Sequence, residues 1–337
     1  EVSTVSGDLS VNEDIAADSV VLNAGSAQAA GTATGGNITI ASGKTITATS
    51  ALLYTGSVSG STNVTALVGS GSGNFRYNGD ATTVYTGAGV MGAEGAYAIY
   101  REQPLLSVSP GAATTQYGDA INLSGLNYTL GGHVNGDSDA HAAISGAASY
   151  TTTATASSDV DQYNIVYDTG LLSAIGYGFA DGASSADEYS ITQRVLNMSG
   201  TRVYDGSDVA AAADLTTFSN IVGGQTLTLS GAGTLTDKNV ADDKAVGLGS
   251  LALADGTGAA TNYTLAGGTH TLTVTPKGIS ASGITADDKA YDGNTDATLS
   301  TGGAGFDGLI AGDSITVTAT GTFEQKNVGS DISVTVD

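Results

Sequence analysis

Paired aspartates are the residues of this chain whose types and spacing come closest to those of a catalytic or metal site. The pairs are Asp137/Asp139, Asp159/Asp161, Asp242/Asp243 and Asp287/Asp288. Two carboxyl groups that face each other across a cleft hydrolyse glycosides, and carboxylate oxygens in flexible loops bind calcium. Adjacent or alternating aspartates in turns are more often simply solvated, and the chain has no EF-hand loop. The sequence therefore predicts no cofactor and leaves calcium at Asp242, Asp243, Asp287 and Asp288 as the alternative.

The histidines give no better candidate for a catalytic site. A Ser-His-Asp triad needs a histidine that is held by an acid and faces a nucleophile. His133 and His141 lie in a polar Gly/Asp/Ala stretch, and His270 lies between threonines of a predicted strand. We expect surface or turn positions for all three. The chain also has no Gly-x-Ser-x-Gly motif and no phosphate-binding loop, so we expect a protein that is not an enzyme.

The charge balance excludes several classes of partner. The chain has 33 Asp and Glu against 10 Lys and Arg, a formal net charge of −23. Such a chain repels phosphate backbones and anionic lipid surfaces, so we expect no nucleic-acid binding. Cysteine is absent, which excludes disulfides and thiol nucleophiles. No apolar run is long enough to cross a bilayer, and we expect no membrane insertion.

The composition predicts an all-β fold. Strand-favouring Thr, Val, Ile and Tyr are plentiful, and 49 glycines provide many tight turns. Stretches rich in Leu, Glu, Lys and Arg, which favour helices, are absent. A hydrophobic share of 40% argues against disorder.

A duplicated unit occupies the C-terminal part of the chain. The motif Tyr204-Asp205-Gly206 returns as Tyr291-Asp292-Gly293, 87 positions later, and Lys238-Asn239 returns as Lys326-Asn327, 88 positions later. The first copy spans 196–277, and the second spans 278–337 and stops in mid-unit at Asp337, so we expect the chain to be part of a longer protein. Tandem units are typical of proteins built for reach or display.

The repeated motifs have a physical interpretation. Tyr-Asp-Gly predicts a strand that enters a tight turn, with glycine supplying a positive φ. Lys238 and Lys326 are expected to pair with a carboxylate or to bind backbone carbonyls. Leu227/Leu229 and Ile315/Val317 alternate as a buried strand face. Thr275-Pro276-Lys277 marks a domain boundary, because proline cannot continue a central strand.

The N-terminal segments have a different pattern. In residues 1–48, short period-2 apolar runs such as Leu9/Val11 and Ile38/Ile40 alternate with turn residues. This spacing favours the rungs of a right-handed parallel β-helix, with a β-sandwich as the alternative. Residues 49–103 are rich in tyrosine and are expected to cap the open end of the stack. The rings would cover the end and leave their hydroxyl groups in water.

Several motifs resemble those of known families. Ala51–Val58, Asn74–Tyr77 and Tyr97–Pro104 resemble the segment that closes the β-helix of filamentous-haemagglutinin-like adhesins, which are exported by two-partner secretion. Tyr117-Gly118-Asp119, followed by predicted strands at 126–129, 161–167 and 188–192, makes 104–195 similar to the MBG family of surface domains. The duplicated motifs resemble the YDG domain of the same adhesins.

The resemblance implies a fold, a function and a location. The fold would be the capped end of a right-handed parallel β-helix followed by tandem small β domains, sandwich or β-grasp-like. The chain would be a non-enzymatic stalk of a large secreted adhesin or biofilm matrix protein, extracellular and bound to a Gram-negative outer membrane. Its partners would be an outer-membrane transporter or anchor, extracellular carbohydrate or another cell surface, and itself. A self-assembling fibre or sheath and a carbohydrate-active enzyme on a β-helix remain the alternatives.

Overall fold

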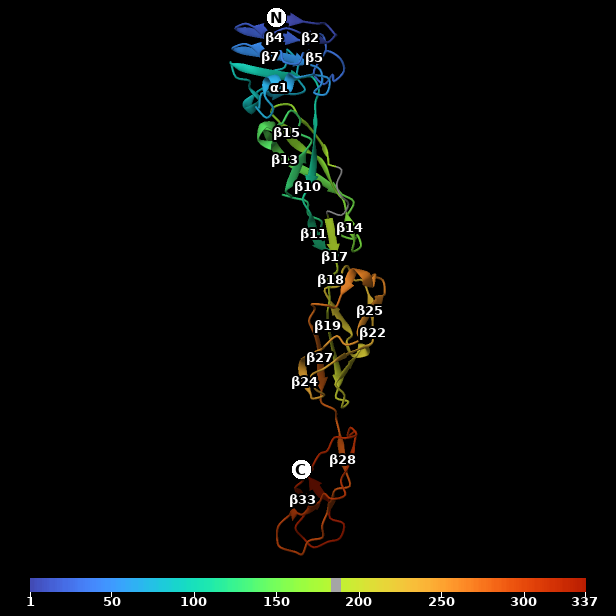
Figure 1. The fold of residues 1–337 in the computed structure, drawn as a ribbon. Coiled ribbons are helices and arrows are strands. Elements are labelled where there is room, and N and C mark those ends of the chain that lie inside the picture. Colours follow the sequence, from blue (N-terminus) through green and yellow to red (C-terminus); the bar gives the residue numbers. More distant parts are fainter. Residues whose placement is uncertain (183–188) are drawn as a thin grey trace. The chain divides into compact units, whose positions relative to one another are not determined.

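The computed structural model describes residues 1–182 and 189–337, and it divides into two compact units, Glu1–Thr192 and Gln193–Asp337 (Figure 1). Strands make up 40% of the chain and helices 5%, so the protein is predominantly β, as the composition predicts. Glu188, the first residue of the strand expected at 188–192, lies outside the described residues.

Parallel strands build the N-terminal part of the first unit. The main sheet contains, in spatial order, β1 Val2–Ser3, β4 Ser19–Asn23, β7 Ser50–Thr55, β9 Gly95–Tyr100 and β8 Phe75–Arg76. Two further parallel pairs are β2 Leu9–Val11 with β5 Ile38–Ile40, and β3 Ile15–Ala16 with β6 Ile46–Thr47. The consecutive strands β2, β3 and β4 thus pair with β5, β6 and β7, respectively. Partners are 29 positions apart in Leu9/Ile38 and 31 apart in Ser19/Ser50, so the second pass of the chain stacks on the first.

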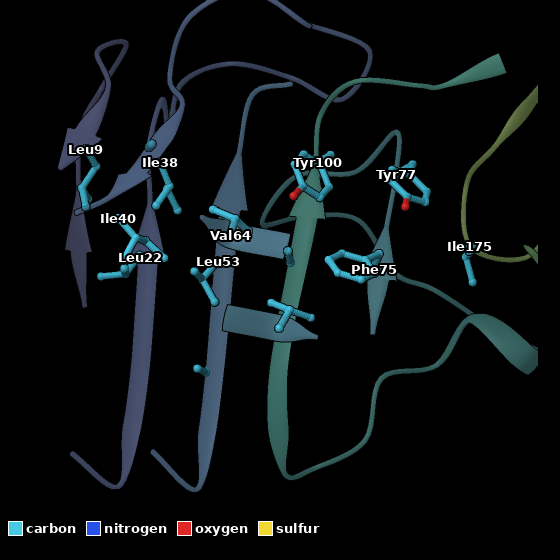
Figure 2. Close-up of a cluster of buried hydrophobic side chains, with 14 of the residues drawn as sticks. Leu9, Leu22, Ile38, Ile40, Leu53, Val64, Phe75, Tyr77, Tyr100 and Ile175 are labelled. Carbon is cyan, nitrogen blue, oxygen red and sulfur yellow. The ribbon is translucent and has the colours of Figure 1, made fainter. Parts of the chain in front are cut away.

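Alternating apolar residues fill the inside of this stack. Leu9, Val11, Leu22, Ile38 and Ile40 are buried, which confirms the period-2 pattern of the sequence. Each such side chain removed from water contributes about 1.5–3 kcal/mol. The short helix α1 Val64–Val68 packs its own valines against the same core (Figure 2). The stack is therefore held by a continuous apolar interior.

The aromatic rings of the predicted cap lie inside the protein. Tyr77 and Tyr100 are 0% exposed and stack with ring centroids 5.7 Å apart, next to Phe75 (Figure 2). The expectation that the hydroxyl groups of this segment stay in water is wrong for these two tyrosines. The reason is that Ile175 and Tyr177, from a much later segment, join the same core and close it from outside.

A buried arginine completes the end of the stack. Arg101 is 1% exposed, and its guanidinium donates to the carbonyl oxygens of Ala24 at 2.7 Å, Gly35 at 3.0 Å and Gly36 at 2.9 Å. Gly36 has a φ of +57°, and a Cβ there would lie 2.5 Å from Arg101 Nη2, so only glycine fits. Burial lowers the pKa of Arg101, but guanidinium groups stay charged in proteins. One side chain thus satisfies three loop carbonyls.

Short sheets form the rest of the first unit. One sheet contains β12 Tyr128–Gly131, β10 Leu105–Pro110 and β16 Gly178–Asp181, and another contains β11 Ala113–Gln116, β17 Tyr189–Thr192 and β14 Gln162–Tyr163. An antiparallel hairpin joins β13 Ile144–Thr152 and β15 Ile165–Ser173. The helical turns are α2 Asp139–Ala142 and η1 Gly87–Gly89. Strands thus lie in the three regions where the sequence predicts them.

The first repeat copy forms most of the second unit. Its main sheet contains β21 Thr217–Ser219, β19 Asn197–Val203, β27 His270–Thr275 and β24 Ala241–Ala245. The two-stranded sheets are β18 Arg194–Val195 with β26 Tyr263–Thr264, β20 Val209–Ala211 with β23 Ala232–Thr234, and β22 Leu227–Ser230 with β25 Ala252–Asp255. Short 3₁₀ turns are η2 Ala212–Asp214 and η3 Ala260–Asn262. In β22, Leu227 is buried, as its alternation predicts, and Leu229 is half-buried.

The second copy repeats part of the strand pairing of the first. Its elements are β28 Ser280–Ser282 with β32 Gly305–Asp307, β29 Thr285–Ala286 with β31 Leu299–Ser300, and the sheet β30 Asp296–Ala297, β33 Gly321–Phe323 and β34 Val334–Val336. The pair Asp296↔Thr322 occupies the place of Val209↔Thr234, at offsets of 87 and 88. The one-residue slip between the motifs therefore falls between β30 and β33.

The buried strand face expected at Ile315 and Val317 is wrong. Neither residue lies in a strand, and Ile315 is 40% exposed. In the first copy the corresponding strand β22 is paired with β25, 22 or more residues farther along the chain. The residues that would match β25 lie beyond Asp337, outside the given sequence, and Ile315 and Val317 are unpaired in the part that the structure describes.

Replacing Arg101 tests its role at the end of the stack. Arg101→Met leaves three carbonyl acceptors without their donor, and we expect the opening free energy of this region to fall by about 3 kcal/mol. Hydrogen exchange of the Ala24 amide, which donates to Tyr54 O, reports the opening. Lys44→Met removes the exposed ion pair with Glu13 and serves as the control, with an effect under about 1 kcal/mol. Equal protection in both variants would contradict the assignment.

Candidate functional site

A buried carboxylate lies where the tyrosine-rich segment meets the strands that follow it. The side chain of Asp137 is 0% exposed. Its Oδ2 accepts hydrogen bonds from Tyr77 Oη at 2.7 Å and from Tyr177 Oη at 3.0 Å. Asn135 Nδ2 donates to Tyr77 Oη at 3.1 Å, and Thr65 Oγ1 donates to Asn135 Oδ1 at 2.6 Å. Residues from three separate stretches of the chain thus converge on one carboxylate.

The elements around Asp137 explain this convergence. Tyr77 directly follows β8, Tyr177 directly precedes β16, and Asp137 stands just before α2. The two tyrosine rings have centroids 4.5 Å apart. The Tyr77 amide also donates to Ile175 O at 2.8 Å, so backbone and side chains join the same two segments. The network therefore holds these segments together.

Burial controls the acidity of the tyrosines in this network. Burial raises the pKa of Tyr77 far above its ordinary value, and the hydrogen bond with Tyr177 adds to the shift. Burial also raises the pKa of Tyr177 and of Tyr100 to about 12. Both partners of Asp137 therefore stay protonated donors across the physiological pH range.

The histidines lie closer to acids than the sequence indicated. His141 Nδ1 is 3.8 Å from Asp137 Oδ1, and His133 Nε2 is 3.0 Å from Asp139 Oδ1. His270 is buried, and its Nε2 lies 2.9 Å from Leu265 O, so its expected surface position is wrong. Ser138 Oγ lies 3.4 Å from His141 Nδ1 at an exposed position. That distance is too long for a hydrogen bond that would activate a nucleophile.

Each Tyr-Asp-Gly motif forms the expected turn. Asp205 Oδ1 accepts from the Ser207 amide at 3.0 Å, and Asp292 Oδ1 accepts from the Asn294 amide at 3.1 Å. The motif glycines, Gly206 and Gly293, have φ values of +80° and +82°. The prediction of a turn with a positive φ at glycine is confirmed in both copies.

A basic residue two places before each tyrosine supports the turn, and sequence reasoning missed it. Arg202 donates to Val209 O, and Lys289 donates to Asp296 O, which are equivalent carbonyls at an offset of 87. Each cation also lies near the motif aspartate, at 3.5 Å in the first copy and 2.9 Å in the second. The recurrence of Arg and Lys at this position was the signal available in the sequence.

Tyr117-Gly118-Asp119 forms a comparable turn in the first unit. Tyr117 is buried and follows β11, and its amide donates to Thr192 O at 2.9 Å. Gly118 has a φ of +86°, and the Asp119 amide donates to Gln116 O. The motif therefore ends a strand and tethers it to β17.

Lys238 pairs with a carboxylate, as expected, but the carboxylate comes from the second copy. Its Nζ lies 2.5 Å from Asp313 Oδ1, and Tyr204 Oη donates to Asp313 Oδ2 at 2.7 Å. The hydrogen bond with Asp313, followed by that with Tyr204, raises the pKa of Lys238, and the hydrogen bonds from Lys238 and Tyr204 lower the pKa of Asp313. The neighbouring Asn239 donates its amide to Asp237 Oδ1. Two of the predicted motif residues thus meet at one acid.

The second-copy motif residues stand in a more open setting. Tyr291 is 64% exposed, and Lys326 and Asn327 are exposed as well. All three line one hollow of about 710 Å³, together with Asp287 and Asp288. The contact predicted for Lys326, with a carboxylate or with backbone carbonyls, stays a prediction.

The aspartates named for calcium do not gather into a cage. Asp242 and Asp243 lie at an irregularity in β24, where Asp243 has a φ of +46°. Asp287 and Asp288 follow β29. In residues 1–182 and 189–337, no group of three or more His, Cys, Asp or Glu side chains is placed to hold a metal, whereas calcium takes six to eight oxygen ligands. Calcium binding stays a prediction without geometric support.

Within the described part of the chain, helices are too short or too polar to cross a membrane.

Removing the buried carboxylate tests the junction around Asp137. Asp137→Ala leaves two buried hydroxyl groups without their acceptor, and we expect the local opening free energy to fall by about 3 kcal/mol. Hydrogen exchange of the Tyr77 amide measures it. Asp139→Ala is the matched control, because that side chain is 70% exposed, and its effect should stay within about 1 kcal/mol. If the two variants behaved alike, Asp137 would not hold the junction.

The same network predicts a loss of stability at high pH. A tyrosine whose folded pKa is raised stabilises the fold fully below its unfolded pKa, about 10, and loses this contribution as pH rises through the folded value. For Tyr177 the window runs from about 10 to about 12. We expect a late phase of phenolate absorbance that coincides with unfolding of the first unit. Tyr177→Phe should reduce this phase by one tyrosine; a single early phase for all 15 tyrosines would contradict the prediction.

Comparison with protein families finds the YDG domain in two segments of this chain, residues 188–271 and 275–337. The comparisons with curated proteins and with solved structures gave no match. The two segments contain both Tyr-Asp-Gly turns, the supporting Arg202 and Lys289, and the pair formed by Lys238 and Asp313. The duplicated part of this chain therefore consists of YDG-type domain sequence.

Proposed function

We propose that this chain is a non-enzymatic stalk or display segment of a large secreted bacterial surface adhesin or biofilm matrix protein. Its work would be mechanical: successive modules extend a binding region away from the cell, and many weak contacts add up through multivalency. The YDG-type repeat supports this proposal, because repeated modules add length without building a shared cleft.

The observation that carries the proposal is the junction at Asp137. A stalk transmits position only if consecutive segments are fixed to each other. Tyr77, from the tyrosine-rich segment, and Tyr177, from the later strands, donate to the same buried carboxylate and pack ring against ring. The Asp137 side chain has no solvent contact, so any other arrangement of the two segments would leave buried hydrogen-bonding groups without partners. The junction therefore favours one arrangement of these segments. The buried hydrogen bonds at Asp137 thus connect two segments of the chain.

We also propose a finer architecture. Residues 1–48 would be the last rungs of a right-handed parallel β-helix, and 49–103 its cap, as in filamentous-haemagglutinin-like adhesins of two-partner secretion. Residues 104–195 would be an MBG-like domain, 196–277 a YDG-like domain and 278–337 part of a second one. The parallel pairing of β2, β3 and β4 with β5, β6 and β7 supports the first assignment, since each pass of a β-helix stacks on the previous one.

The proposed setting is the surface of a Gram-negative cell. The parent protein would be held by an outer-membrane transporter or anchor and would contact extracellular carbohydrate or a neighbouring cell. The charge of −23 and the absence of cysteine suit an exported chain that must stay soluble. Calcium stays a candidate ligand without an assigned site, and the chain would need no other cofactor.

Electron microscopy of native cells tests the proposal. Antibodies raised against this chain, with immunogold detection, should label separate thin rods rooted at one end in the outer membrane, and mass spectrometry of the sheared rods should recover this sequence. A strain that lacks the gene provides the control and should lose both label and rods. Label confined to the cell interior would refute a surface role, and cleavage of a polysaccharide by the purified chain would refute a non-enzymatic one.

The same images distinguish the second candidate, a self-assembling fibre or sheath. Such an assembly would join chains through strand edges, because an open strand edge accepts another strand. Continuous fibres with an axial repeat near one chain length, and growth that depends on concentration, would replace the stalk by a polymer.

A further inference from the structure

The two YDG-type copies meet through one small surface, which we call the Tyr–Lys face. In the first copy it consists of Tyr204, Gly206, Lys238, Asn239 and Val240. It contacts the acidic loop of the second copy, residues 308–315, which carries Asp313. Both sides of this contact belong to the same compact unit, Gln193–Asp337.

The acid of the loop is held by two different donors. Tyr204 Oη donates to one carboxylate oxygen of Asp313 at 2.7 Å, and Lys238 Nζ donates to the other at 2.5 Å. Lys238 Nζ also lies 5.7 Å from the centroid of the Tyr204 ring, within the range of a cation–π interaction. Both oxygens of one carboxylate are thus used, and an amide could satisfy only one of these donors.

The motif glycine lets the loop come close. A Cβ placed on Gly206 would lie 2.7 Å from Ile310 Cγ2, a separation that atoms do not tolerate. Gly206 therefore serves both the turn, with its positive φ, and the approach of the next copy. Ile310 adds an apolar contact beside the charged one, so the docking depends on the fit of the side chains as well as on charge.

The second copy presents the same face without an occupant in the described residues. Its members, at offsets of 87 and 88, are Tyr291, Gly293, Lys326, Asn327 and Val328. Tyr291 is 64% and Val328 85% exposed, and a Cβ on Gly293 would meet nothing within 4 Å. Four of these residues line the hollow of about 710 Å³ beside the Tyr-Asp-Gly turn.

The residue at the loop position differs between the copies. At an offset of 88, Asp313 corresponds to Gln225 of the first copy. Gln225 Oε1 accepts from Tyr263 Oη of its own copy at 2.6 Å. The copy that follows another YDG-type copy thus carries the acid, and the copy that follows a different segment carries an amide that is used internally.

We propose that the Tyr–Lys face is a docking surface for the acidic loop of a following YDG-type copy, and that the face of the second copy accepts a further copy with Asp at the position of Asp313. The occupant follows from the contact in the first copy, because the same tyrosine, glycine and lysine recur and in the first copy they contact this loop. The inference concerns contacts between modules and does not rest on the proposed role at a cell surface.

An extended chain tests the proposal directly. Residues 250–277 are appended after Asp337, followed by a second run of 278–337; this completes the second copy with its equivalent from the first and adds a third. Residue 250 is the correct position to continue from Asp337, because the strand pair Thr322↔Thr335 of the second copy matches the pair Thr234↔Gly247 of the first at an offset of 88. The chain has no cysteine, so cysteines introduced at Ser300 and at its counterpart in the added copy take spin labels specifically.

The distribution of distances between the labels is the readout. We expect one narrow distribution that broadens when the added Asp becomes Gln or when Lys326→Ala is introduced. Exchanging the charges, with Lys326→Asp and the added Asp→Lys, should restore it. Distributions that stay unchanged by these substitutions would overturn the proposal, since the linker alone would then set the distance.

The contact between the first and second copies, which is present in the full chain, provides a second test. In the full chain, with cysteines introduced at Thr216 and Ser300, Asp313→Gln should broaden the distribution, because Tyr204 and Lys238 lose their shared acceptor. Asp307→Asn, an exposed acid on β32 next to the acidic loop, is the matched control and should leave it unchanged. An unaltered distribution in Asp313→Gln would also overturn the proposal, whatever the extended chain does.

Discussion

The parallel stack and both YDG-type copies depend on donors for backbone carbonyl groups that strand pairing leaves without a partner. Buried carbonyls without a donor are costly, and short strands joined by long loops produce many of them. The donors are the guanidinium groups of arginines and the ammonium group of a lysine. Arg101 satisfies three loop carbonyls at the end of the parallel stack, and Arg76 donates to the carbonyls of Gly73, Phe75 and Gly89. Arg202 and Lys289 do the same for the Tyr-Asp-Gly turns.

Most cations of this chain are bound within it. Arg76 and Arg101 donate to backbone carbonyls, and Lys44 and Lys238 each pair with one acid. The 33 acidic residues outnumber the 10 basic ones and give the formal net charge of −23, which favours repulsion between modules of different chains.

Local patterns predicted local structure well. The alternation of apolar residues at Leu9/Val11 and Ile38/Ile40 predicted the strands there, and the aspartate and glycine of Tyr-Asp-Gly predicted a turn. Contacts between distant segments could not be found this way. The sequence pointed to Asp137 only as one member of a pair with Asp139, and its role at the junction follows from its contacts with Tyr77 and Tyr177. His270 lies between threonines and is nevertheless buried, with its ring nitrogen Nε2 2.9 Å from the carbonyl oxygen of Leu265. Ile315 shows the reverse: a good strand pattern without a partner strand stays a loop.

The order of strands in the first YDG-type copy has a mechanical consequence. Its first long strand, β19, and its last, β27, are parallel neighbours joined from Met198↔His270 to Val203↔Thr275. Tension applied to the two ends of this copy pulls at Asn197 and at Thr275, which lie at opposite ends of the pair. The strands must then slide past each other, and the hydrogen bonds of all six paired positions are loaded at once instead of opening one by one. Stretching therefore loads this strand pair in shear, the geometry in which a small sheet resists stretching most.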